Sequence, residues 1–162
     1  MNILVLASLL MGLVGTALIG GLLFAFSICV MKALSSVPNE EGIRVMQKIN
    51  RFILNPLFFA VFFGTTILSA ANVIFMAIGL GGDWPSTFML ALAAYLIGTF
   101  LVTAVGNVPM NNRLDVLDPS EGAEYWRKYL KDWTRLNHLR SAASVISILM
   151  YGIGFIQVTI NV

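Results

Sequence analysis

The placement of charge along the chain constrains the fold more than any other feature. All ten lysine and arginine residues fall in two segments, residues 32–51 and 113–140. The stretches without any charged side chain cover residues 3–31, 52–80, 87–106 and 141–161. Each of these is long enough to cross a bilayer as a helix, which takes about 20 apolar residues. Composition agrees, because only 11% of the residues are charged, against about 25% in soluble domains.

The sequence therefore predicts an all-α membrane protein. We expect one domain over residues 1–162: a bundle of four transmembrane helices with cytoplasmic helical extensions. The two polar loops, 32–51 and 107–140, carry all the lysine and arginine, so the positive-inside rule places both in the cytoplasm. Both termini then lie on the non-cytoplasmic side of a bacterial inner or plasma membrane.

The polar segments carry signals for helix starts. Pro38 to Glu41 predicts a helix that runs directly into the second span, with a kink at Pro56. A second helix start is predicted at Asp118. This residue would be the N-cap, Pro119 the first helical residue, and Glu121 the residue that closes a capping box. Whether that helix continues unbroken into the fourth span is left open. Between spans two and three, residues 79–86 predict a short turn with Trp84 as an interfacial anchor.

Small residues recur every fourth position in the first span. They are Ser8, Gly12, Thr16 and Gly20. Such a ridge lets a neighbouring helix approach closely, so we expect helix packing there.

A stripe of polar and aromatic residues descends into the fourth span. At 100° per residue one helix face holds Trp126, Tyr129, Trp133, Asn137, Arg140, Ser144, Ser147 and Tyr151. One interpretation is a helix–helix seam, with aromatic rings at the headgroup level and serines bonding between helices. The other is one wall of a ligand pocket at the membrane surface, with Arg140 as its charged member.

A second concentration of polar residues follows the third span. The segment contains Asn107, Asn111, Asn112 and Arg113 around a proline. These residues fit either capping and turn roles or a polar rim that converges on the stripe.

The cysteine and histidine content limits disulfide bonding and metal binding. One cysteine, Cys29, excludes an intrachain disulfide, and one histidine, His138, excludes a multi-histidine metal site. We therefore predict no metal and no other cofactor.

Three motifs together resemble a known family. They are INRFILNP at 49–56, NVPMNNRLD at 107–115 and WRKYLKDWTRLNHLR at 126–140. This pattern is similar to the anthrone oxygenase family (DUF1772) of small four-span membrane proteins. The resemblance implies oxidation of an anthrone to an anthraquinone by molecular oxygen, as credited to fungal members, without an evident metal or flavin.

The resemblance also points to candidate site residues. They are Asn107, Asn111, Asn112, Arg113, Trp126, Trp133, Asn137 and Arg140, with Asn50 and Asn55 expected at the same end of the bundle.

The chemistry of such a substrate assigns roles to these residues. An anthrone has an acidic CH₂ group, and its enolate reacts with oxygen directly. The site then needs an apolar slot, a base, and donors for the enolate oxygen. We expect Trp126, Tyr129 and Trp133 to form the slot. Arg113 and Arg140, aided by Asn111 and Asn137, would stabilise the oxyanion.

His138 is the natural candidate for the base, since histidine exchanges protons near neutral pH. It lies about 120° from the stripe on an ideal helix, however, which favours a structural or interfacial role instead.

Other functional classes stay open. The chain could bind a quinone, a lipid or another hydrophobic molecule without turnover, or serve as an accessory subunit of a membrane complex. A transporter is disfavoured, because the four spans contain no carboxylate for proton coupling. We expect a hydrophobic small molecule and membrane lipid as partners, and no nucleic acid. Assembly into a homo-oligomer stays open.

The predicted orientation is testable with a reporter that works only in the cytoplasm. We expect the reporter to be inactive when fused after Val162 and active when inserted at Ser120, because the positive loops stay inside. An active carboxyl-terminal fusion contradicts the orientation.

Overall fold

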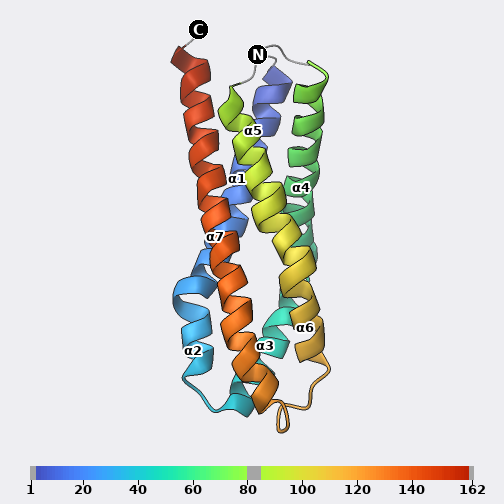
Figure 1. The fold of residues 1–162 in the computed structure, drawn as a ribbon. Helices are drawn as coiled ribbons and strands as arrows, with labels where there is room; N and C mark the ends of the chain where they lie inside the picture. The colour runs from blue at the N-terminus through green and yellow to red at the C-terminus, as the bar shows by residue number, and fades with distance from the viewer. Residues whose placement is uncertain (1–2, 80–84, 161–162) are drawn as a thin grey trace.

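Four long helices lie side by side in the computed structural model, which describes residues 3–79 and 85–160 (Figure 1). The helices long and apolar enough to cross a membrane are Ile3–Ser35, Pro56–Ala77, Ser86–Asp115 and Ala123–Ile160. The predicted four-helix membrane bundle is confirmed. Trp84 and most of the predicted turn at 79–86 lie outside the described residues.

Two of the four spans contain π-helical segments. The first span comprises α1 (Ile3–Ala25), η1 (Phe26–Val30) and α2 (Met31–Ser35). The third comprises α5 (Ser86–Ala93), η2 (Ala94–Leu101), η3 (Thr103–Asn107) and α6 (Val108–Asp115). Each π segment widens the helix locally and shifts the faces that follow it. The third span therefore extends as a helix well past residue 106, into the segment predicted as a loop.

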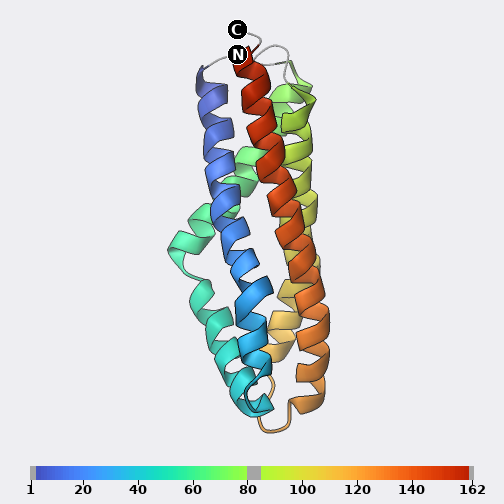
Figure 2. The ribbon, with the colours of Figure 1, turned by 90° about the vertical axis from the view of Figure 1, so that its left-hand side faces the viewer.

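The sequence predicted that the helix of the first polar loop runs directly into the second span, and this prediction is wrong. Helix α3 (Asn39–Ile53) ends before Leu54, and α4 (Pro56–Ala77) begins after Asn55. Pro56 disfavours helical geometry in the residue before it, and Asn55 is extended, with φ −109° and ψ 163°. The Asn55 side chain accepts a hydrogen bond from the Phe58 amide at 3.0 Å and caps α4. The expected kink is therefore a complete break (Figure 2).

Helix α7 (Ala123–Ile160) answers the question that the sequence left open, because it is continuous into the fourth span. It starts later than predicted, however, and the capping box at Glu121 does not form. The carboxylate of Asp118 instead accepts the backbone N–H and the hydroxyl of Ser120, at 2.9 and 2.6 Å. These bonds close a turn rather than a helix, and they hold the pKa of Asp118 below its usual value.

We call the end of the bundle farthest from the termini the basic end. It comprises α2, α3, α6 and the first half of α7 (Figure 1). It holds one of the apolar core clusters, in which Met31, Ile43, Met46 and Leu114 pack around the aromatic residues of α7.

The small-residue ridge of the first span makes the close contacts that the sequence predicted. A Cβ added to Gly12 would lie 2.7 Å from the Tyr151 hydroxyl, and one added to Gly20 would lie 2.9 Å from the Cβ of Ser144. Gly15, beside this ridge, is tighter still, because its Cβ would lie 1.9 Å from Oγ1 of Thr65. Glycine thus allows α1 to contact both α4 and α7.

We expect Gly15→Ala to lower the free energy of unfolding by about 1–3 kcal/mol, because α1 and α4 must separate to admit the methyl group. Gly21→Ala is the matched control, since nothing lies within 4 Å of the added Cβ. Thermal midpoints in detergent compare the two variants, and equal midpoints would contradict the packing.

Candidate functional site

The polar and aromatic stripe of α7 lies inside the bundle. All eight of its residues are buried. The face therefore contacts the other helices, as both sequence interpretations require. Which interpretation holds depends on whether the polar atoms are satisfied within the protein or face a cavity.

The first three residues of the stripe form a stacked series that we call the aromatic ladder: Trp126, Tyr129 and Trp133. The rings of Trp126 and Tyr129 are 5.5 Å apart at 16°, and those of Tyr129 and Trp133 are 5.9 Å apart at 22°. Trp126 and Tyr129 are fully buried. The ladder is thus a rigid wall within the core rather than an open slot.

Arg140 continues this wall into the membrane. Its guanidinium carbon lies 5.1 Å from the ring centre of Trp133, a cation–π arrangement. It donates to Oδ1 of Asn137 at 2.8 Å and to Oγ1 of Thr103 at 3.1 Å. The residue is 5% exposed.

The hydrogen bonds that the buried Arg140 guanidinium donates go to uncharged side chains. Among the described residues no carboxylate forms an ion pair with Arg140, and its Nε has no hydrogen-bond partner. Asp115, a candidate partner by sequence, instead pairs with Arg51.

The π-helical segments meet around this charge. Asn137 donates to the Leu23 carbonyl at 2.8 Å and to the Ser27 hydroxyl of η1 at 2.7 Å. Thr103 of η3 accepts from Arg140, and Asn107 of the same segment donates to the Trp133 carbonyl at 3.3 Å. π-Helical turns occur often at functional sites. Here they bring polar side chains of spans one and three to the stripe.

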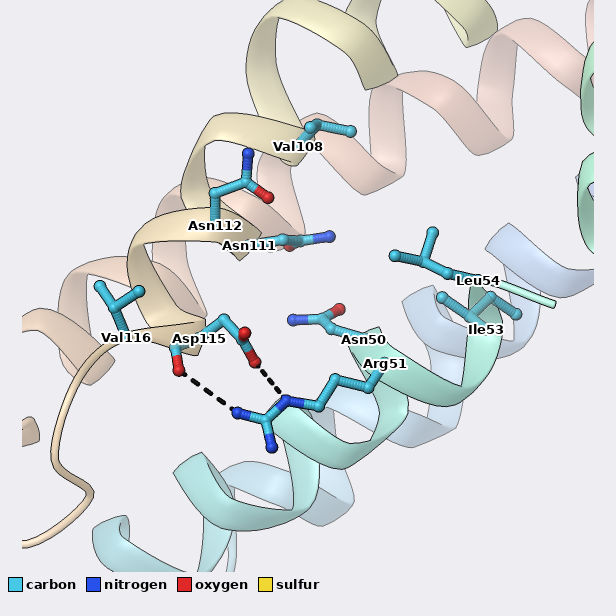
Figure 3. Close-up of a pocket in the computed structure, with 9 residues that line it drawn as sticks. All are labelled: Asn50, Arg51, Ile53, Leu54, Val108, Asn111, Asn112, Asp115 and Val116. Atoms are coloured by element: carbon cyan, nitrogen blue, oxygen red, sulfur yellow. Dashed lines mark hydrogen bonds and ion pairs between the residues drawn. The ribbon is translucent and has the colours of Figure 1, made fainter.

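Asn111 of α6 connects the ladder to open space. Its Oδ1 accepts the Tyr129 hydroxyl and the Trp133 Nε1–H, both at 2.8 Å. An indole N–H can only donate, so these bonds fix the amide with its oxygen toward the ladder. The Nδ2 group then points the other way, into the gap between α6 and α3 (Figure 3).

That gap is a pocket of about 360 Å³, which we call the α3–α6 pocket (Figure 3). Its lining residues are Asn50, Arg51, Ile53, Leu54, Val108, Asn111, Asn112, Asp115 and Val116. Typical ligand pockets have volumes of about 300–1,000 Å³ and combine apolar walls with a few polar groups. This pocket has both properties.

Asn50 gives the pocket a further amide, besides those of Asn111 and Asn112. Asn50 is 9% exposed, and its buried Nδ2 has no hydrogen-bond partner in the protein. The Asn50 amide lies beside the Tyr129 hydroxyl at the back of the pocket. An unpaired buried donor is costly, so a ligand oxygen that reaches it would stabilise it.

An ion pair between Arg51 and Asp115 lines the pocket on the side toward the basic end. Arg51 Nε lies 2.7 Å from Asp115 Oδ1, and both side chains remain partly exposed. Asp115 is thus a carboxylate in the pocket wall, with one oxygen held by a cation (Figure 3).

The other predicted site residues lie in different places. Asn112 lines the α3–α6 pocket, whereas Trp126, Trp133, Asn137 and Arg140 lie behind it in the core. Arg113 stacks over Tyr125, with 4.6 Å from its guanidinium carbon to the ring centre, and lines a separate pocket with Tyr129.

His138 and Asn55 lie away from the α3–α6 pocket. His138 is exposed in a groove between the first span and α7, together with Ser27 and Ser141. Asn55 caps α4.

Sequence reasoning missed the Arg51–Asp115 pair. The two residues are 64 positions apart, and each lies among other charges in a polar segment. No local pattern singles them out. For metal binding, the described residues contain no group of three histidine, cysteine or acidic side chains.

Four membrane-spanning helices with a polar pocket at one end define an integral membrane protein with a candidate binding site. Residues 57–150 match the family model of anthrone oxygenase, and the chain belongs to the anthrone oxygenase family. The match includes Asn111, Asp115 and Arg140 but not Asn50. Comparisons with curated proteins and with solved structures return no match.

Substitution of the buried guanidinium tests its role in the wall. We expect Arg140→Lys to lower the free energy of unfolding by about 1–3 kcal/mol, because one ammonium cannot replace the planar fork that bonds Asn137 and Thr103. Arg135→Lys, on the exposed face of α7, is the control. Equal stability of both variants in detergent would favour a snorkelling role for Arg140 instead.

Proposed function

We propose that this protein is a membrane-embedded oxygenase that binds a polycyclic phenol, such as an anthrone, in the α3–α6 pocket. One observation carries the proposal: the aromatic ladder fixes the Asn111 amide so that its Nδ2 group faces the pocket, beside the unpaired Nδ2 of Asn50. Two amide donors held toward one space are suited to a carbonyl or phenolate oxygen.

The walls of the pocket suit the rest of such a molecule. Ile53, Leu54 and Val108 provide apolar surface for fused rings. The amide donors lie on the buried side, so the ligand oxygen would point inward and the rings outward.

The reaction that the family name describes makes use of these donors. A base removes one proton from the CH₂ group, and the resulting enolate places its negative charge on the oxygen held by the amides. The enolate carbon gives one electron to dioxygen, and the radical and superoxide combine to form a C–O bond. Proton transfer, loss of the second C–H proton and cleavage of the O–O bond release water and leave the new carbonyl. One dioxygen is thus consumed for each quinone and each water formed.

Asp115 is the base that we assign to the first step. It is a carboxylate in the pocket wall, whereas His138 opens onto a different groove. Arg51 holds one carboxylate oxygen at 2.7 Å, which leaves the other oxygen free to accept a proton. The pair orients Asp115, so that its free oxygen can accept the proton.

Arg140 acts as a positioning residue in this scheme. Its guanidinium supports Trp133, and Trp133 donates to the Asn111 oxygen. The charge therefore acts on the ligand through the orientation of Asn111 rather than by contact.

The substitution Asn111→Asp tests the donor directly. A carboxylate still accepts the bonds from Tyr129 and Trp133, but it no longer donates into the pocket and it repels an enolate. We expect turnover of anthrone to fall about 10²–10³-fold, as for other lost oxyanion donors, with the protein still folded. Asn55→Asp is the control, because aspartate caps a helix as well as asparagine does. Unchanged turnover in Asn111→Asp contradicts the proposal.

Replacement of the base should separate binding from chemistry. In Asp115→Asn the pocket keeps its shape but loses the proton acceptor, so we expect at least about a 10²-fold loss of turnover with binding within a few-fold of wild type. The control is Asp132→Asn, outside the pocket. Oxygen uptake measures turnover, and full activity in Asp115→Asn rules out this base.

Binding without turnover is a second candidate, because Asp115, the base assigned to the pocket, is already engaged in an ion pair with Arg51. In that case the same amides would hold a quinone oxygen. Anthrone-dependent oxygen uptake by the purified protein distinguishes the two functions.

A further inference from the structure

The α3–α6 pocket opens on the side of the bundle, where the chain leaves α3. The break at Leu54 and Asn55 displaces the α3–α4 connection outward from the other helices (Figure 2). Leu54 lines the pocket and is nevertheless 58% exposed. The mouth therefore faces sideways, between α3 and α6.

Two kinds of surface border this mouth. Leu54 and Val108 form the border nearer the centre of the bundle, and the apolar side chains next to them, Phe52, Leu57 and Val105, are also exposed. The Arg51–Asp115 pair forms the border toward the basic end.

The apolar border of the mouth is suited to contact with the acyl chains of the bilayer. Leu57, Val105 and Val108 belong to helices long and apolar enough to cross a membrane, and large apolar side chains exposed on such helices lie in hydrocarbon. Arginine and aspartate at helix ends lie at the headgroup level. The mouth thus straddles the boundary between acyl chains and headgroups, with the amide donors of Asn50 and Asn111 behind it.

We propose that the ligand enters this pocket laterally from the bilayer rather than from water. This inference rests on the proposed function, and it narrows the substrate class to polycyclic phenols that partition into membranes. The ligand enters with its oxygen leading toward the amides, and substituents on the opposite edge of the rings remain in lipid. Long apolar substituents on that edge are therefore tolerated, and bulky hydrophilic ones are not.

Tethered probes test the route, with the wild-type protein in lipid nanodiscs. The probe is a dihydroxyanthraquinone, a stable polycyclic phenol, whose fluorescence anisotropy reports binding. It is used free, linked to a long saturated alkyl chain, or linked to a water-soluble polymer. We expect the free and alkyl-linked probes to bind with half-saturation within about tenfold of one another, and the polymer-linked probe not to bind.

A pair of leucine variants locates the entrance. Leu54→Trp places a larger side chain at the mouth and should weaken binding of the alkyl-linked probe at least about tenfold. Leu57→Trp is the matched control, since Leu57 is exposed nearby but does not line the pocket. Thermal midpoints confirm that both variants fold.

The outcomes separate the two proposals. If the free probe does not bind to wild type, both the pocket assignment and the lateral route are wrong. If the free and polymer-linked probes bind but the alkyl-linked probe does not, the proposed function stands and lateral entry is overturned. Equal effects of the two leucine variants also contradict lateral entry at Leu54.

Discussion

The buried guanidinium of Arg140 is the constraint on which the basic end of the bundle depends. A charge removed from water costs several kcal/mol unless other groups solvate it, and no carboxylate of the described residues pairs with this one. Neutral groups take that role: Asn137, Thr103 and the face of Trp133. Thr103 lies in the π-helical segment η3, and Ser27 of the π-helical segment η1 accepts a hydrogen bond from Asn137. Two of the three described π segments thus lie where spans one and three pass the charge.

The same network reaches the pocket through hydrogen bonds. Trp133, supported by Arg140, shares the Asn111 oxygen with Tyr129. This arrangement settles which end of the amide faces the pocket, and a donor rather than an acceptor is the result. In our account, the aromatic ladder therefore does not form the binding slot. It is a rigid backing that preorganises one donor, while apolar residues of α3 and α6 form the slot itself.

Much of this fold follows from charge placement and helical periodicity. Four stretches without charge predicted the four spans, and 100° spacing placed the stripe from Trp126 to Tyr151 on one face, which is buried throughout. The same angle predicted that His138 would point away from the stripe. Local signals failed where tertiary context decides. The break at Leu54, the turn at Asp118 and the π segments depend on specific hydrogen bonds. The Arg51–Asp115 pair joins segments distant in sequence, so periodicity gives no sign of it.

The most direct measurement of the central claim uses the side-chain amides themselves. Isotope labelling of asparagine gives NMR signals for the Nδ2 groups, and the Asn111→Asp variant assigns one of them by its loss. On addition of a dihydroxyanthraquinone to the protein in nanodiscs, the account predicts that the signals of Asn50 and Asn111 shift together and saturate. The signal of Asn72, buried at the opposite end, should stay in place. A shift of Asn72 with no change in Asn50 and Asn111 would contradict the account.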